Sequence, residues 1–141
     1  MFLVDTDVLS ALAKRRRDPN VEVWIAHQRT SDLFVSVISI GEVERGIALK
    51  RGKDPNFAAR LATWLDQILN LYGDRVLAFD LASARRWGEL TAVLGHHGAD
   101  LQIAATALEH GLTVVTRNTS DFVPCGVQVL DPFRSPQRRR V

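Results

Sequence analysis

Four acidic residues stand at positions where their carboxylates could act together on one substrate. They are Asp5, Glu42, Asp100 and Asp121. Four negative charges in one cleft repel one another, and burial adds a desolvation cost, so a hard divalent cation would relieve the strain. Mg²⁺ binds through a few carboxylates, keeps several waters and accepts the phosphate oxygens of a substrate. Carboxylates gathered in this way would therefore suit metal-dependent hydrolysis of a phosphodiester bond.

The apolar pattern predicts the elements that would bring these acids together. Apolar runs at 2–4, 33–37, 76–79 and 112–116 predict buried strands, and the run at 127–130 predicts a short edge strand. Helices are predicted between them, and the signals that start them are Asp18-Pro19, Ser39, Asp54-Pro55, Asp80 and Asp100. Strands that alternate with helices predict an α/β domain with a central parallel sheet of about four to five strands and helices on both faces.

This topology places the acids at one edge of the sheet. Asp5 directly follows the first strand, Glu42 begins the helix after the second, and Asp121 lies in the predicted loop 116–122 after the fourth. Asp100 begins the helix that leads back into the fourth strand, so it should start near the same edge. In open parallel sheets the carboxyl edge of the strands is where ligands bind.

Neutral polar residues follow the same strands and could assist the carboxylates. Asn118 could orient an attacking water, and Thr6 or Thr116 could contact a carboxylate or a phosphate. The three tryptophans fall on the apolar faces of predicted helices, which favours packing in the core over stacking on bases.

Each acid taken alone also has a purely structural explanation. Asp7 is more simply explained as a helix cap than as a ligand. Glu42 with Ser39 matches a capping box, in which the glutamate side chain bonds the backbone of the first residue. Asp100 sits near a helix start, where an acid is favoured by the helix dipole, and Asp121 could form a turn.

Length and composition fit one soluble domain. The chain has 141 residues, of which 46% are hydrophobic and 24% charged, as in ordinary globular proteins. Its single cysteine, Cys125, excludes an internal disulfide and a zinc site built from several cysteines. No apolar run approaches the roughly 20 residues of a membrane span, and no signal peptide is recognisable, so we expect a cytoplasmic protein.

The C-terminal end of the chain is basic, whereas the rest is slightly acidic. The segment 134–141 holds four arginines and no acid, which leaves 14 basic against 16 acidic residues in 1–133. We therefore expect one domain at 1–133 and a flexible basic tail at 134–141. Such a tail suits a polyanionic partner, or is simply a solvated end of the chain.

Four stretches of the sequence carry a resemblance to a known family. They are LVDTD at 3–7, SIGEVERGI at 39–47, ADLQIAATA at 99–107 and TRNTSDF at 116–122. In this order they resemble the PIN-domain ribonucleases, and in particular the VapC-type toxins of bacterial toxin–antitoxin pairs. The last two stretches together are the most specific part of the resemblance.

The resemblance implies an activity, a cofactor and partners. Proteins of this kind cleave RNA with Mg²⁺ or Mn²⁺, and their acids match Asp5, Glu42, Asp100 and Asp121, with Asn118 at an accessory polar position. They usually form homodimers, and a small VapB-type antitoxin blocks the site, while its own DNA-binding end directs repression. DNA would thus be contacted only through the antitoxin. The segment Gly95-His96-His97-Gly98 departs from the family, because it lacks the proline often seen before the third acid.

Other functions share parts of this pattern. A haloacid-dehalogenase-like phosphatase also places paired acids after its first strand, but it needs a later lysine, and no lysine follows Lys53. A receiver domain also opens with paired acids, yet Asp80, which ends the third predicted strand region, has no lysine partner. A non-catalytic RNA-binding module with a basic tail would leave the acids unexplained.

Overall fold

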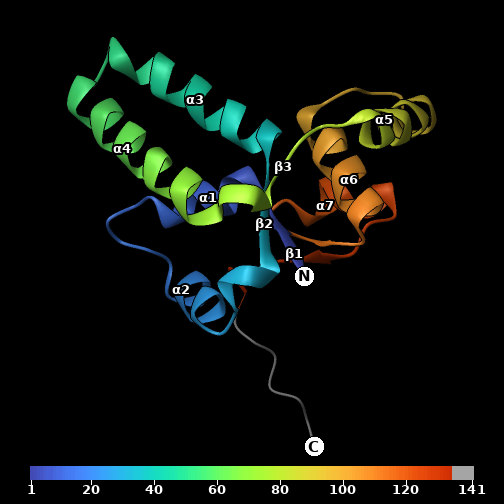
Figure 1. Cartoon of the computed structure of the whole chain (residues 1–141), viewed down its shortest axis with the longest axis horizontal. Helices are drawn as coiled ribbons and strands as arrows, with labels where there is room; N and C mark the ends of the chain where they lie inside the picture. Colours follow the sequence, from blue (N-terminus) through green and yellow to red (C-terminus); the bar gives the residue numbers. More distant parts are fainter. Residues whose placement is uncertain (135–141) are drawn as a thin grey trace, which may run out of the picture.

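A computed structural model of the chain describes residues 1–134 (Figure 1). The strands are β1 (Phe2–Val4), β2 (Leu33–Ser36), β3 (Val76–Leu77), β4 (Thr113–Val115) and β5 (Val129–Leu130). The α-helices are α1 (Thr6–Leu12), α2 (Pro19–Ala26), α3 (Val37–Arg51), α4 (Pro55–Tyr72), α5 (Leu81–Leu94), α6 (Ala99–His110) and α7 (Thr119–Phe122). Single 3₁₀ turns are η1 (Thr30–Asp32), η2 (Gly73–Arg75) and η3 (Val123–Cys125).

The strands form one parallel sheet in the order β3-β2-β1-β4-β5. From β1 the chain moves to one side through β2 and β3, and it then crosses to the other side for β4 and β5. The strand order therefore reverses between β1 and β4, and a crevice opens at the carboxyl ends of strands at such a switch point. The predicted α/β class, the parallel sheet and the edge position of β5 are confirmed.

The two faces of the sheet bury separate sets of side chains. Val4, Val35 and Val115 point to the face covered by α1, α2, α3 and α4. Leu3 and Val114 point to the opposite face, which is covered by α5, α6 and α7. Because neighbouring residues of a strand point to opposite faces, the unbroken apolar runs of β1 and β4 are what a sheet buried on both faces requires. Figure 1 shows the long pair α3 and α4 on one side and the pair α5 and α6 on the other.

Helix ends follow the predicted signals in most places. Asp18, Asp54 and Asp80 each accept a hydrogen bond at the start of α2, α4 and α5. Gly111 ends α6 in the left-handed conformation, with a φ of 65°, which glycine adopts without strain. These caps fix where each helix meets the sheet.

Several predicted boundaries were wrong, including those of the last two strands, which are shorter than predicted, at Thr113–Val115 and Val129–Leu130. The helix after the second strand, α3, begins at Val37 instead of Ser39. Ser36 provides its cap, and β2 ends one residue earlier than predicted. The third strand is only Val76–Leu77, since the chain leaves the sheet before Phe79. The segment after β4 is not a plain loop, because it contains the single-turn helix α7, which carries Asp121.

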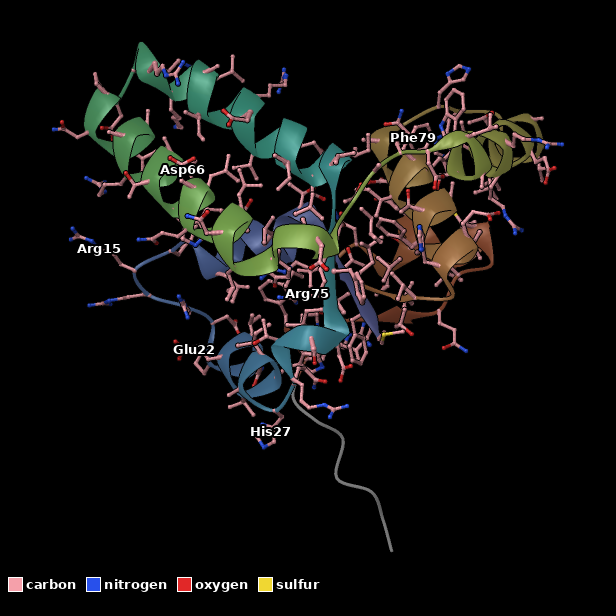
Figure 2. The ribbon with its side chains drawn as sticks, in the orientation of Figure 1. Arg15, Glu22, His27, Asp66, Arg75 and Phe79 are labelled. Atoms are coloured by element: carbon pink, nitrogen blue, oxygen red, sulfur yellow. The ribbon has the colours of Figure 1, made fainter. Side chains whose placement is uncertain are left out.

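Arginine and tryptophan side chains tie the helices to the sheet. Arg75 donates to the backbone oxygens of Leu33 at 2.8 Å and Leu71 at 2.9 Å, so it joins the start of β2 to the end of α4 (Figure 2). Trp24 packs edge-on against Phe2, with ring centroids 5.2 Å apart. Trp87 and Trp64 also pack against the core clusters, as predicted.

No helix within residues 1–134 is long and apolar enough to cross a membrane. The expected domain boundary at 133/134 falls at the end of the described part of the chain. Apart from Arg134, the basic tail lies outside the described residues.

Candidate functional site

Asp5 occupies the switch point between β1 and β4. Its backbone N–H continues the sheet by donating to the oxygen of Val115 at 2.9 Å. Its side chain caps α1, because Oδ1 accepts from the N–H of Thr6 at 2.8 Å. Oδ2 accepts from the hydroxyl of Thr116 at 2.8 Å, so the predicted contact of Thr116 with a carboxylate is confirmed. Only 4% of Asp5 is exposed, so both carboxylate oxygens are held in a fixed orientation.

The surroundings of Asp5 favour its neutral form. Burial and the charge of Asp7 raise the pKa of Asp5 to about 7, and Asp100 adds to this rise. The hydrogen bonds from Thr116 and Thr6 act in the opposite direction without offsetting it. A carboxylate buried among other carboxylates is in part protonated at neutral pH, unless a cation is present.

Glu42 lies on the first turns of α3, on the exposed side of the same edge. Its Oε1 accepts from the hydroxyl of Thr6 at 2.7 Å, and the Thr6 hydroxyl also lies 2.9 Å from that of Ser39. The capping-box interpretation of Glu42 was wrong, because the cap of α3 is Ser36, whose hydroxyl accepts from the N–H of Ile38 at 3.0 Å. The side chain of Glu42 thus connects α3 to α1 and takes no part in starting the helix.

Asp7 was not predicted as a site residue, and its interpretation as a cap was wrong. It lies inside the first turn of α1, and Asp5 is the cap. Its Oδ2 accepts from the backbone N–H of Arg117 at 3.0 Å, and its charge raises the pKa of both Asp5 and Asp100. The spacing of two residues between the acids at the end of β1 was the available signal, since it keeps both near the start of one helix.

Asp100 lies in the first turn of α6 and is half-buried. Burial raises its pKa, and the charges of Asp121, Glu42 and Asp7 raise it further, while His96 lowers it slightly. The elements that carry these acids are far apart in the sequence, yet the charges of Asp121 and Glu42 act on Asp100, and that of Asp100 acts on Asp5. The structure therefore brings Asp5, Glu42, Asp100 and Asp121 to one edge of the sheet.

Asp121 and Asn118 complete the predicted set on the β4 side. Both are exposed. The backbone N–H of Asn118 donates to the hydroxyl of Thr116 at 3.0 Å, which anchors the segment leading into α7. Within residues 1–134 the side-chain amide of Asn118 has no hydrogen-bond partner and does not cap α7, so it is free to meet a substrate or a water.

The chemistry of these donors fits a hard divalent cation. They are carboxylate oxygens. Burial is the main cause of the raised pKa values of Asp5 and Asp100, and the neighbouring carboxylates raise them further, so a cation would stabilise the charged forms. Within residues 1–134, however, no three His, Cys, Asp or Glu side chains are arranged so that they could hold an ion as they stand. Ion binding would therefore require side chains to move, and the exposed Glu42 and Asp121 have the freedom to do so.

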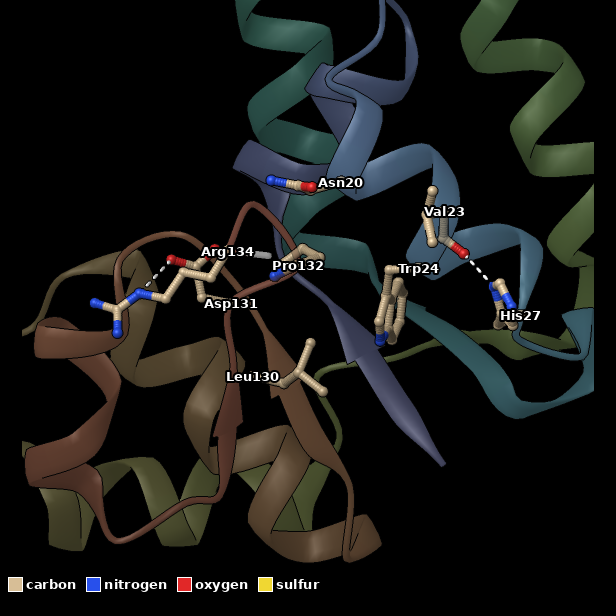
Figure 3. A pocket seen from close by; sticks show the side chains of 8 residues that line it. All are labelled: Asn20, Val23, Trp24, His27, Leu130, Asp131, Pro132 and Arg134. Atoms are coloured by element: carbon tan, nitrogen blue, oxygen red, sulfur yellow. Dashed lines mark hydrogen bonds and ion pairs between the residues drawn. The ribbon is translucent and has the colours of Figure 1, made fainter. Parts of the chain in front are cut away.

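A separate apolar pocket lies between α2 and the segment after β5 (Figure 3). Its volume is about 500 Å³, and Trp24, Leu130 and Pro132 contribute much of its apolar lining. None of the predicted site residues lines it, so we separate it from the carboxylate edge.

Comparison with known proteins identifies the family of the chain. The model of the PIN domain family matches residues 2–122, which include every predicted site residue. The chain belongs to the PIN domain family. It is 36% identical to the VapC ribonuclease Y4jK of Sinorhizobium fredii, over 94% of this chain and 98% of that protein. It is 35% identical to the toxin FitB of Neisseria gonorrhoeae, over 94% of this chain and 99% of that protein.

Solved structures show the same fold in complexes. The structure of FitAB bound to an IR36 DNA fragment superimposes with a TM-score of 0.85 and 30% identity, and the match covers 99% of this chain and all of that one. Membership of the PIN domain family argues against the haloacid-dehalogenase and receiver interpretations.

Proposed function

We propose that this protein is a Mg²⁺- or Mn²⁺-dependent endoribonuclease and the toxin of a VapBC-type toxin–antitoxin pair. The observation that carries the proposal is the gathering of carboxylates around Asp5 at the switch point of a PIN domain. The names of its relatives, a VapC ribonuclease and the toxin FitB, support the same activity.

Each residue of the site has a distinct task in this proposal. Asp5 and Asp100 would be the principal ligands of the cation, because burial and, after it, the other carboxylates raise their pKa values. When bound, the cation would offset their charge and polarise a phosphate oxygen. Thr6 and Thr116 keep the Asp5 carboxylate in place by hydrogen bonds to its two oxygens.

The exposed residues would act on the attacking water. Glu42 and Asp121 would complete the charge cluster and accept a proton from that water, and Asn118 would orient it by its free side-chain amide. Attack in line with the leaving oxygen inverts the configuration at phosphorus.

Cleavage of RNA in the presence and absence of a chelator tests the proposal. We expect cleavage with Mg²⁺ or Mn²⁺ and none in excess EDTA, with recovery when the metal is added back. Cleavage that persists in excess EDTA at the same rate would overturn the metal-dependent mechanism. Absence of cleavage of any RNA by folded protein with either metal would overturn the nuclease itself.

The toxin proposal implies partners. We expect a homodimer in the cytoplasm and a small VapB-type antitoxin that occupies the acidic edge, where an arginine or lysine would replace the positive charge of the metal. DNA would be bound through the antitoxin, in line with the FitAB complex on a DNA fragment. Expression of the protein alone should arrest growth, and co-expression of the antitoxin should relieve the arrest. Unaffected growth in cells that contain folded protein would contradict the toxin assignment.

A further inference from the structure

Arg117 is held beside the carboxylate edge with its hydrogen-bond donors unused. Its guanidinium carbon lies 3.6 Å from the centroid of the Phe133 ring, which is a close cation–π contact. Within residues 1–134 its side chain forms no hydrogen bond and no ion pair, although it is exposed and charged. A ring contacts the face of a guanidinium, whereas the N–H donors lie in its plane and stay available at its rim.

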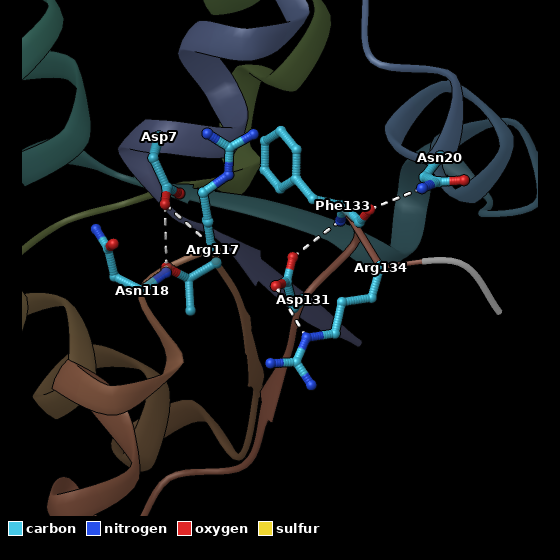
Figure 4. A network of polar contacts seen from close by, with 8 residues as sticks. Asp7, Asn20, Arg117, Asn118, Asp131, Phe133 and Arg134 are labelled. Atoms are coloured by element: carbon cyan, nitrogen blue, oxygen red, sulfur yellow. Dashed lines mark hydrogen bonds and ion pairs between the residues drawn. The ribbon is translucent and has the colours of Figure 1, made fainter. Parts of the chain in front are cut away.

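The backbone of Phe133, whose ring contacts Arg117, is held by two hydrogen bonds (Figure 4). Its backbone N–H donates to Oδ1 of Asp131 at 2.9 Å, and its backbone oxygen accepts from Nδ2 of Asn20 at 2.7 Å. Asn20 belongs to α2 and Asp131 follows β5, so one distant and one local contact hold the backbone of Phe133 in place. The guanidinium therefore rests on a surface that is built by the fold.

The backbone of Arg117 is bonded directly to the acidic edge. Its N–H donates to Oδ2 of Asp7 at 3.0 Å, and the next N–H along the chain, that of Asn118, donates to the hydroxyl of Thr116. The same hydroxyl donates to Asp5. A short series of hydrogen bonds thus fixes the position of Arg117 relative to Asp5.

The direction of the side chain matters for its function. Figure 4 shows the Arg117 side chain rising between Asp7 and the Phe133 ring, with its guanidinium against the ring. An arginine beside several carboxylates would form an ion pair if its task were to neutralise them, but this one is bound to an aromatic face instead. Its free donors suit an anion that arrives with the substrate.

We propose that Arg117, held against Phe133, binds a phosphodiester group of the RNA next to the one that is cleaved. The inference rests on the proposed nuclease function. The planar guanidinium can donate two parallel N–H bonds to the oxygens of one phosphate. Phe133 keeps the charge away from the carboxylates, which would otherwise compete for it, and presents it to the neighbouring phosphate of the strand.

Binding of RNA by a chain that does not cleave tests this inference. In the full-length Asp100→Asn chain, we would measure the affinity for a fluorescent single-stranded RNA of mixed sequence, at several salt concentrations. Arg117→Gln should weaken binding about tenfold and reduce the slope of log affinity against log salt by about 0.7, the value for one lost contact to a single strand. Arg117→Lys should retain most of the slope but only part of the affinity, since a lysine cannot donate the parallel pair.

Two further variants separate the effect of the Phe133 ring from the effect of losing an arginine charge elsewhere on the surface. Phe133→Leu should weaken binding about threefold with an unchanged salt slope, because the charge remains but its position is lost. Arg85→Gln is the matched control, since Arg85 is an exposed arginine on α5, and its loss should leave RNA affinity within twofold of the parent. Binding is compared at a temperature where thermal unfolding shows every variant to be folded.

The outcomes distinguish this inference from the proposed function. If the parent cleaves RNA but Arg117→Gln and Arg117→Lys bind it as the parent does, with the same salt slope, the phosphate site is overturned and the nuclease stands. The same holds if Arg117→Gln weakens only the complex with an antitoxin, since Arg117 would then be a protein contact. If the parent neither binds nor cleaves RNA, both proposals fall.

Discussion

Asp5 and Glu42 stand at the carboxyl ends of the neighbouring strands β1 and β2, yet the fold treats their carboxylates in opposite ways. Asp5 is buried and has a donor on each oxygen, whereas Glu42 is exposed and held by one threonine hydroxyl. The buried charge has a fixed position and costs stability, because its pKa is raised to about 7. The exposed charge costs little and can move. A site built in this way has one side that is fixed by the sheet and one side that adjusts to what binds.

The largest expected effect comes from the buried side. Asp5→Asn should lower the rate of RNA cleavage at least about a thousandfold, roughly 4 kcal/mol of transition-state stabilisation, because it removes the charge that a cation needs. Asp100→Asn should have a similar effect. Cleavage is measured under single-turnover conditions with Mg²⁺, and circular dichroism checks the fold.

Asp66→Asn is the matched control for these variants. Asp66 is an exposed acid on α4, labelled in Figure 2, and it takes no part in the carboxylate edge. Its replacement should leave cleavage unchanged. A loss of less than about tenfold in Asp5→Asn would mean that the buried acid is only a helix cap.

The second prediction concerns stability and pH. The pKa of Asp5 is about 7 in the folded protein and 3.8 as its ordinary value, so the folded state binds this proton more tightly than the unfolded state. Its contribution to stability is fully present below pH about 4 and is lost as the pH rises through about 7, amounting to on the order of 2 to 4 kcal/mol. In EDTA, the melting temperature of the parent should therefore fall by several degrees more than that of Asp5→Asn between pH 5 and pH 8.

Divalent metal supplies the control for this prediction. Mg²⁺ at pH 8 should raise the melting temperature of the parent and have a much smaller effect on Asp5→Asn, since binding to the folded state alone stabilises it. Parallel melting curves for the two chains across this pH range would contradict the raised pKa of Asp5.

The third prediction addresses the exposed side. Glu42→Gln should lower cleavage at least about tenfold, roughly 1.4 kcal/mol, because the negative charge is lost. Its melting temperature should stay within a few degrees of the parent, since the amide oxygen can still accept from Thr6. Glu44→Gln, an exposed glutamate on the same helix, should retain parental activity. Near-parental cleavage by Glu42→Gln, at saturating and at limiting Mg²⁺, would show that Glu42 is dispensable and that aspartates carry the site.

The sequence was sufficient for the sheet and insufficient for the contacts at its edge. Unbroken apolar runs predicted a sheet buried on both faces, and the acids that follow these runs were predicted to meet. The contact of Arg117 with the Phe133 ring could not be predicted, because it joins the segments that follow two neighbouring strands, β4 and β5. The spacing of Asp7 from Asp5 was a signal for its place at the edge, but its hydrogen bond to the backbone of Arg117, 110 residues away, was not visible in the sequence.

The boundary between β2 and α3 shows a second limit. Ser36, Ser39 and Glu42 all carry side chains that favour a helix start, so the local pattern allowed two caps. The register of the sheet decides between them, because Ser36 pairs with Leu77 as the last residue of β2 and is thereby placed at the beginning of the helix. Such a choice depends on tertiary structure and is not visible in a short stretch of sequence.

The smallest expected effect tests this choice of cap. Ser36→Ala should cost about 1 kcal/mol of unfolding free energy, because the N–H of Ile38 loses its buried acceptor. Ser39→Ala should cost less, since its hydroxyl only approaches that of Thr6, and Thr6 still donates to Glu42. Denaturant unfolding measures both, and a capping box at Ser39 would produce the reverse order.

Neither variant should change cleavage more than about threefold where the protein is folded, because neither removes a charge from the edge. A large loss of cleavage in Ser36→Ala with an unchanged melting temperature would mean that the start of α3 positions Glu42 more strictly than its exposure suggests, and the adjustable side of the site would then be limited to Asp121.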